Sequence, residues 1–301
     1  MSTMNREQIM FERFYENREN EKEMFLVEGL ICDERRKTVR LTDDTDDGVD
    51  FSNKTYLEYK YRFDGKLMTV ISIFRRTPMI GKNYKELDGN PFIYALKNDN
   101  TTDKQKNEWR FDITDEEIRK YIRRFLEVCD SIDKEYDTII MVPSSHNINR
   151  RFMKVIFERV GAKDKVEDFF YKISKEDAYD SRDLDAISIY CGRKCNYDIK
   201  RANQMEERVL DEIDYCFDQM KGEYFQAAKM KKEYLRFIPD IVTRNNKYSL
   251  ETASKLIRDK RVLVLDDVLS TGLTISSCVK NIRQYGPKSI HVITLLSNKQ
   301  K

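Results

Sequence analysis

Two adjacent aspartates and a run of hydroxyl-bearing residues near the carboxyl end of the chain have the spacing of a sugar-phosphate site. The segment 262–274 reads VLVLDDVLSTGLT. Its apolar run predicts a buried strand that places Asp266 and Asp267 at its carboxyl end, where ligands bind in doubly wound sheets. The segment 270–274 then offers successive N–H groups, three hydroxyls and a glycine, which suit a phosphate at a helix amino terminus.

The two carboxylates would repel a phosphate unless they faced another group. Ribose hydroxyls donate hydrogen bonds to carboxylates, so the segment predicts a diol at the acids and a 5′-phosphate at the loop. The alternative is an acidic turn before a capped helix, in which Ser270 and Thr271 have only a structural role. A P-loop nucleotide hydrolase is disfavoured because the chain contains no G-x-x-x-x-G-K-[ST].

This segment resembles the phosphoribosyl-pyrophosphate (PRPP) signature of type I phosphoribosyltransferases. That signature is an apolar strand, two acids, two further residues and a Ser/Thr-Thr-Gly-x-Thr loop. The resemblance implies that Asp266 and Asp267 are the catalytic pair and hold the ribose 2′- and 3′-hydroxyls. The residues that it implies for the 5′-phosphate are Ser270, Thr271, Gly272, Leu273 and Thr274.

An earlier loop has the position that this family uses for pyrophosphate. The segment 141–151 reads MVPSSHNINRR and contains Arg150 and Arg151 as nearby positive charges. Its residues that correspond to pyrophosphate ligands are Ser144, Ser145, His146 and Asn147. His146 stands where the family often has a basic residue, and a plain turn before a helix cap is the alternative.

Strands and amphipathic helices must alternate to position these two loops. Apolar runs predict strands at 137–142, 261–265 and 289–296, and helical stripes follow the first two. This alternation indicates an α/β fold, doubly wound, with a mainly parallel sheet in which the three strands are neighbours. Thr114 and Glu117 predict a capping box at the start of a further helix.

The remaining sequence predicts an α+β amino-terminal region and a helical insertion. Alternating runs at 57–63 and 67–74 flank Asp64-Gly65, which is typical of a type I′ hairpin. Apolar residues at helical spacing predict the insertion at about 199–238. We therefore expect an α+β region at 1–110 and a phosphoribosyltransferase-like domain at 111–301 that contains this insertion.

Composition excludes several classes of protein. The 301 residues carry 55 Lys and Arg against 53 Asp and Glu, and this balance disfavours a nucleic-acid partner. Apolar runs are too short for a bilayer, and the amino terminus lacks a secretory core, so we expect a cytoplasmic protein without a membrane partner. Six cysteines with only two histidines favour buried thiols over a zinc site.

The resemblance implies an enzyme, a glycosyltransferase that uses PRPP to transfer phosphoribose to a nucleobase or similar acceptor. Its expected cofactor is Mg²⁺, which binds through substrate phosphates and needs no dedicated ligand cluster. The expected partner is PRPP or another small molecule that contains ribose 5-phosphate, and a homodimer is compatible with this function.

The alternative is a non-catalytic protein on the same fold that senses PRPP or a nucleotide, or that binds a partner, in stress or phage defence. The layout is also similar to that of the competence-associated phosphoribosyltransferase-like proteins. The amino-terminal zinc-binding cysteine pairs of those proteins are absent from this chain.

Overall fold

A computed structural model describes part of the chain, and that part falls into two compact units. The described residues are 29–33, 38–42, 57–63, 65–75, 112–114, 116–117, 127, 132, 135–143, 161–231, 233–238, 240–269 and 272–297. The first unit comprises Met1–Leu57, Ser72–Asp133 and Leu295–Lys301. The second comprises Glu58–Ile71 and Lys134–Thr294 and contains the predicted sugar-phosphate segment.

The first unit contains a small sheet of three strands among its described residues. These are β1 (Gly29–Asp33), β2 (Thr38–Thr42) and β5 (Asp112–Ile113), and β2 pairs antiparallel with β1 and parallel with β5. The Thr114 hydroxyl accepts a hydrogen bond of 3.2 Å from the backbone N–H of Glu117. This bond confirms the amino-terminal cap that the sequence predicts at Thr114.

The main sheet has six strands in the order β3-β4-β11-β10-β6-β7. Strands β10 and β6 pair in parallel from Val262↔Thr138 to Leu265↔Met141. The N–H groups of Lys288 and Ser289 bond to the carbonyl of Lys260, so β11 begins where β10 begins. In chain order the strands are β3 (Leu57–Phe63), β4 (Lys66–Arg75), β6 (Thr138–Met141), β7 (Asp164–Val166), β10 (Arg261–Leu269) and β11 (Ser289–Ser297).

The three strands predicted at 137–142, 261–265 and 289–296 are therefore neighbours, in the order β11-β10-β6. Strand β7 continues the parallel arrangement beside β6. With helices between the strands, this mixed and mostly parallel sheet confirms the predicted α/β fold class.

The predicted hairpin is confirmed, and it lies in the main sheet. Strand β3 ends at Phe63 and β4 begins at Lys66, and Gly65 between them has a φ of +72°. The left-handed conformation of this glycine is the one that a tight two-residue hairpin requires. The alternating pattern did not indicate that β4 lies beside β11. The expected boundary at residue 110 falls outside the described residues and stays a prediction.

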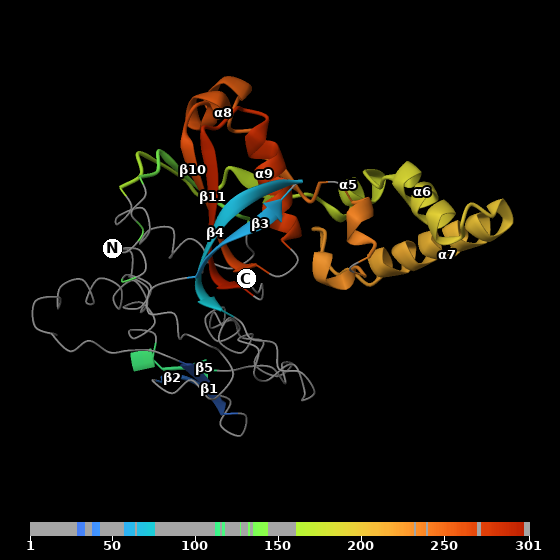
Figure 1. Ribbon diagram of the computed structural model, residues 1–301, viewed down its shortest axis with the longest axis horizontal. Coiled ribbons are helices and arrows are strands. Elements are labelled where there is room, and N and C mark those ends of the chain that lie inside the picture. The colour runs from blue at the N-terminus through green and yellow to red at the C-terminus, as the bar shows by residue number, and fades with distance from the viewer. Residues whose placement is uncertain are drawn as a thin grey trace, which may run out of the picture. The chain divides into compact units, whose positions relative to one another are not determined.

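Two helices accompany β10 and β11 (Figure 1). Helix α8 (Leu250–Ile257) precedes β10, and the Ser249 hydroxyl caps it by accepting the N–H of Thr252. Helix α9 (Leu273–Arg283) connects β10 to β11. The predicted apolar stripe of α9 is buried: Ile275, Cys278, Val279 and Ile282. Among the described residues, no helix combines the length and apolar character that crossing a membrane would take.

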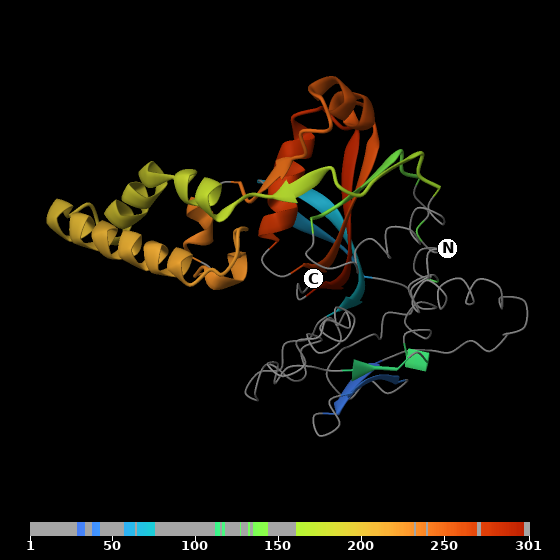
Figure 2. The same cartoon turned by 180° about the vertical axis from the view of Figure 1, so that it is seen from behind.

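The helical insertion is longer than the sequence pattern predicts. It leaves the α/β core through β8 (Phe170–Lys172) and returns through β9 (Val242–Arg244), which pair antiparallel. Between them lie α5 (Lys175–Asp180), α6 (Leu184–Lys194), α7 (Ile199–Asp218), η1 (Ala227–Lys229) and η2 (Leu235–Phe237). Helix α6 packs along α7 (Figure 2). The insertion therefore begins earlier than the predicted residue 199, because it also includes α5 and α6.

Ser277 on α9 fixes the returning strand of the insertion to the core. Its hydroxyl accepts the buried N–H groups of Ile241 and Val242, at 3.2 and 3.4 Å. Three residues along the helix, the ammonium of Lys280 lies 3.0 Å from the carboxylate of Asp240. These contacts hold the insertion against the helix that follows the sugar-phosphate segment.

We expect Ser277→Ala to lower the free energy of unfolding by about 1–3 kcal/mol, because two buried N–H groups lose their acceptor. Urea unfolding measures this change. Ser254→Ala on α8 is the matched control and should change the stability by less than about 0.5 kcal/mol. Equal stability of the two variants would mean that the Ser277 hydroxyl does not hold the insertion.

Candidate functional site

The predicted acid pair lies inside strand β10. The strand continues to Leu269, four residues past the predicted end at Leu265. Its ladder with β6 stops earlier, at Leu265↔Met141, where the N–H of Val142 donates to the carbonyl of Leu265 at 2.9 Å. Asp266 and Asp267 therefore follow immediately after the last pairing with β6. Both side chains are buried, each with 8% of its surface exposed.

The two carboxylates have different surroundings. Successive residues of a strand point to opposite faces of a sheet, so the side chains of Asp266 and Asp267 leave the strand on opposite sides. The N–H of Asp267 donates a 2.9 Å hydrogen bond to Oδ1 of Asp266 and fixes that carboxylate. Burial, together with the negative charge of Asp266, raises the pKa of the Cys278 thiol on α9 well above its usual value. Asp266 is thus the acid whose charge acts on α9.

Gly272 has the conformation and the steric surroundings of a position that favours glycine. Its φ of +75° and ψ of 8° are left-handed, and it is the amino-terminal cap of α9. A Cβ atom there would lie 3.1 Å from Leu269 Cδ1, 3.1 Å from Phe63 Cε1 and 3.2 Å from Tyr61 Cε1. These distances are shorter than ordinary van der Waals contacts, so a side chain at residue 272 would displace its neighbours. Both the left-handed φ and the close neighbours of a Cβ therefore favour glycine at residue 272.

The amino terminus of α9 has the electrostatic properties of an anion site. The helix begins at Leu273 and has 11 residues. Gly272 supplies no capping side chain, and the first turn contains no acidic residue. The partial positive charge of the helix dipole is therefore not offset by the helix itself, and backbone N–H groups point toward the space before it. Thr274 in this first turn is half-buried.

Five of the predicted site residues lie among the described residues, and six lie outside them. Described are Asp266, Asp267, Gly272, Leu273 and Thr274; outside the described residues lie Ser270, Thr271, Ser144, Ser145, His146 and Asn147. The described chain continues two residues past β6, to Pro143, directly before the predicted pyrophosphate loop. Because β6 and β10 are parallel and in register, both strands reach the same edge of the sheet there.

A cavity next to Thr274 adds residues that the sequence pattern did not reveal. Its volume is about 320 Å³. It is lined by Lys172, Phe225, Gln226, Ala227, Ile241 and Thr274. Lys172 is the one charged residue of this lining, and it makes no ion pair with any residue that the structure describes. It ends the short strand β8, so no motif could distinguish it from a surface lysine.

Comparison with known proteins agrees with the motif. No curated protein matches the chain. Residues 207–301 match the family described as phosphoribosyl transferase domain. The matched segment includes the acid pair, Gly272, all of α9 and β11. Over these residues the chain is similar to phosphoribosyl transferase domains, and this similarity supports phosphoribosyl transfer as the general chemistry of the segment.

Proposed function

We propose that the chain is a phosphoribosyltransferase that binds PRPP where β10 meets α9 and transfers phosphoribose to a nucleobase or a similar acceptor. The observation that carries this proposal is the turn at Gly272. Gly272 is left-handed and has close neighbours where a Cβ would lie, and it precedes a helix to which it supplies no capping side chain. It lies three residues after the end of a strand that contains two buried acids. Backbone N–H groups of residues 272–274 would surround the 5′-phosphate.

In this proposal Asp266 and Asp267 bind the ribose. Their carboxylates accept hydrogen bonds from the 2′- and 3′-hydroxyls, and such bonds to charged groups are strong in a buried site. During transfer the bond from C1 of the ribose to pyrophosphate breaks, the pyrophosphate leaves with the electron pair, and the acceptor nitrogen bonds to C1. Positive charge grows on the ribose, and the fixed negative charges of Asp266 and Asp267 would stabilise it.

The loop that follows β6 would bind the pyrophosphate group. Ser144, Ser145 and His146 are proposed as its ligands, because they follow β6 in the chain and β6 ends beside the residue that precedes the acid pair. The carboxylate oxygens of Asp266 and Asp267 are the donor type that Mg²⁺ takes, so the residues present fit this cation. Mg²⁺ would be held mainly by the phosphates of PRPP and by water, with a carboxylate of the acid pair beside it, and it would neutralise the charge of the leaving pyrophosphate.

The acceptor is proposed to enter the cavity beside Thr274. The buried ring of Phe225 offers an apolar surface for a flat base, and Gln226 offers both a donor and an acceptor for hydrogen bonds. The cavity wall comes largely from the insertion, which therefore supplies the acceptor specificity in this proposal. Lys172 would add a positive charge between the acceptor and the phosphates.

We expect Lys172→Gln to weaken PRPP binding by about three- to fivefold, the size of a partly solvated charge interaction. Calorimetric titration with PRPP and Mg²⁺ measures the dissociation constant. Lys221→Gln, an exposed lysine of the same insertion, is the control and should bind as the wild-type protein does. Identical affinities for PRPP in the wild-type protein and both variants would mean that Lys172 does not interact with the phosphates of PRPP.

The proposed activity is tested by the release of pyrophosphate from PRPP and Mg²⁺ with a panel of nucleobases. We expect release that depends on one base or one class of base. A protein that only senses PRPP would show a higher Tm with PRPP and no release, because ligand binding stabilises the folded state by mass action. That second function is favoured by His146, which stands where the family often has a basic residue. No rise in Tm with PRPP would contradict both functions.

A further inference from the structure

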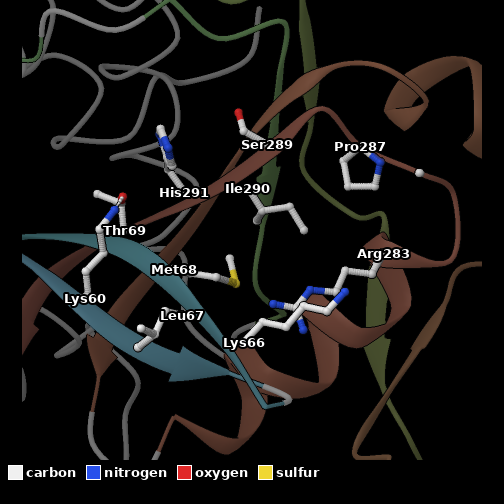
Figure 3. Close-up of a pocket in the computed structure, with 11 residues that line it drawn as sticks. Lys60, Lys66, Leu67, Met68, Thr69, Arg283, Pro287, Ser289, Ile290 and His291 are labelled. Atoms are coloured by element: carbon white, nitrogen blue, oxygen red, sulfur yellow. Dashed lines mark hydrogen bonds between the residues drawn. The ribbon is translucent and has the colours of Figure 1, made fainter.

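A second cavity lies at the opposite end of α9, within the same unit of the chain. Its volume is about 410 Å³. It is open to solvent and is lined by the β3–β4 hairpin, the last turn of α9, the turn at Gly286-Pro287 and the beginning of β11 (Figure 3). The polar side chains in its wall are Lys60, Lys66, Thr69, Arg283, Ser289 and His291. No established or proposed step of phosphoribosyl transfer uses these residues.

The wall of this cavity has a strong positive charge. Three of its residues are cations, Lys60, Lys66 and Arg283, and none is acidic. Within the part of the chain that the structure describes, neither lysine forms an ion pair. Like charges around one hollow repel each other, and a bound anion would remove that repulsion.

Two of the cations are held in place by hydrogen bonds to the hairpin. The ammonium of Lys60 donates to the Thr69 hydroxyl at 2.6 Å, across the two strands. The guanidinium of Arg283 donates to the carbonyl of Phe63 at 3.1 Å. A cation that is already oriented loses little side-chain freedom when an anion binds, so this arrangement favours binding. The guanidinium has five donors in a planar fork that suits phosphate.

The rest of the wall is apolar. Leu67 leaves 61% of its surface exposed, and Met68, Pro287 and Ile290 line the same hollow. Figure 3 shows Met68 and Ile290 between Lys60 on one side and Lys66 and Arg283 on the other. A free inorganic anion would leave this apolar surface in contact with water, whereas a ligand with an apolar body would cover it.

We propose that this cavity binds a small molecule that carries a phosphate group on an aromatic or apolar body. The phosphate would lie among Lys60, Lys66 and Arg283, and the body would lie on Leu67 and Ile290. The site is separate from the turn at Gly272, because the 11 residues of α9 span about 16 Å. The inference therefore does not depend on the proposed function.

Phenyl phosphate is the probe, because it has the phosphate and the aromatic ring but no ribose. The chain contains only two histidines, His146 and His291, so proton NMR shows two imidazole signals that His291→Asn assigns. His291 lines the cavity, whereas His146 belongs to the predicted pyrophosphate loop. We expect phenyl phosphate to shift the signal of His291 in a saturable titration, and phenol to leave it unchanged.

Variants then locate the site. Lys60→Gln with Lys66→Gln should weaken phenyl phosphate binding by about tenfold or more, since each exposed cation contributes up to about fivefold. Lys288→Gln, a nearby lysine outside the cavity wall, should bind normally. Thr274→Ala should also bind normally, because Thr274 lies in the first turn of α9 and outside the wall of this cavity.

Three results would overturn the inference: an unshifted His291 signal, unchanged affinity in the double lysine variant, or loss of binding in Thr274→Ala. The last result would mean that the phosphate binds only at the start of α9. Circular dichroism of each variant verifies that it is folded. Binding that survives 0.5 M NaCl without weakening would also contradict a site built on exposed cations.

Discussion

Gly272→Val is expected to abolish the binding of PRPP and of ribose 5-phosphate, a loss of at least about a hundredfold in affinity. The loss corresponds to two or more charge-assisted hydrogen bonds, each worth roughly 1.5–3 kcal/mol. Valine disfavours a φ of +75°, and its Cβ would meet Leu269, Phe63 and Tyr61 at 3.1–3.2 Å. The backbone of the turn must therefore move away from the conformation that directs its N–H groups at the phosphate. Calorimetric titration measures the affinity.

Gly161→Val is the matched control for this substitution. Gly161 has a similar φ of +68°, but among the described residues no atom beyond its chain neighbours lies within 4 Å of the position of its Cβ. The Gly161→Val variant should have similar backbone strain and an unchanged affinity for PRPP. Gly272→Ala provides a milder change at the site and should weaken binding less than valine does. If Gly272→Val folds and binds ribose 5-phosphate normally, the turn is only a helix start.

Asp267→Asn is expected to lower the affinity for PRPP by a factor of about ten or more, while the fold persists. Asparagine keeps the shape of the side chain but replaces charge-assisted hydrogen bonds to a diol with neutral ones. The backbone N–H of residue 267 still donates to Asp266 Oδ1, so the carboxylate of Asp266 keeps its orientation. The rate of pyrophosphate release should fall by a larger factor than the affinity for PRPP, because the negative charge of Asp267 also stabilises the positive charge that develops on the ribose.

Asp259→Asn is the control for this charge removal. Asp259 is exposed in the turn before β10 and has a φ of +58°, a conformation that asparagine also tolerates. It should change neither PRPP affinity nor pyrophosphate release. Unchanged PRPP affinity in Asp267→Asn would mean that this carboxylate does not face the ribose.

The features predicted correctly are those that local pattern determines. Continuous apolar runs gave the neighbouring strands β6, β10 and β11, because a strand buried on both faces has few polar residues. The requirement for glycine at residue 272 followed from the chemistry of the turn. The helical stripe of α9 and the hairpin at Gly65 are local signals of the same kind.

The features that were missed depend on contacts between distant residues. The alternation in β3 and β4 predicts a hairpin, but only packing against β11 decides which sheet it joins. Helix α6 has only Ile187 and Cys191 buried, so its apolar pattern was too weak to extend the predicted insertion. Lys172 gained its position beside Thr274 from the pairing of β8 with β9, which no local pattern records.

The most direct test of the central claim is a crystal structure of the chain grown with ribose 5-phosphate. We predict that the phosphate lies before the amino terminus of α9, surrounded by the N–H groups of residues 270–274. The ribose hydroxyls should lie within hydrogen-bond distance of Asp266 or Asp267. Ribose 5-phosphate bound only in the basic cavity at the other end of α9, or pointing its sugar away from both acids, would contradict the proposed function.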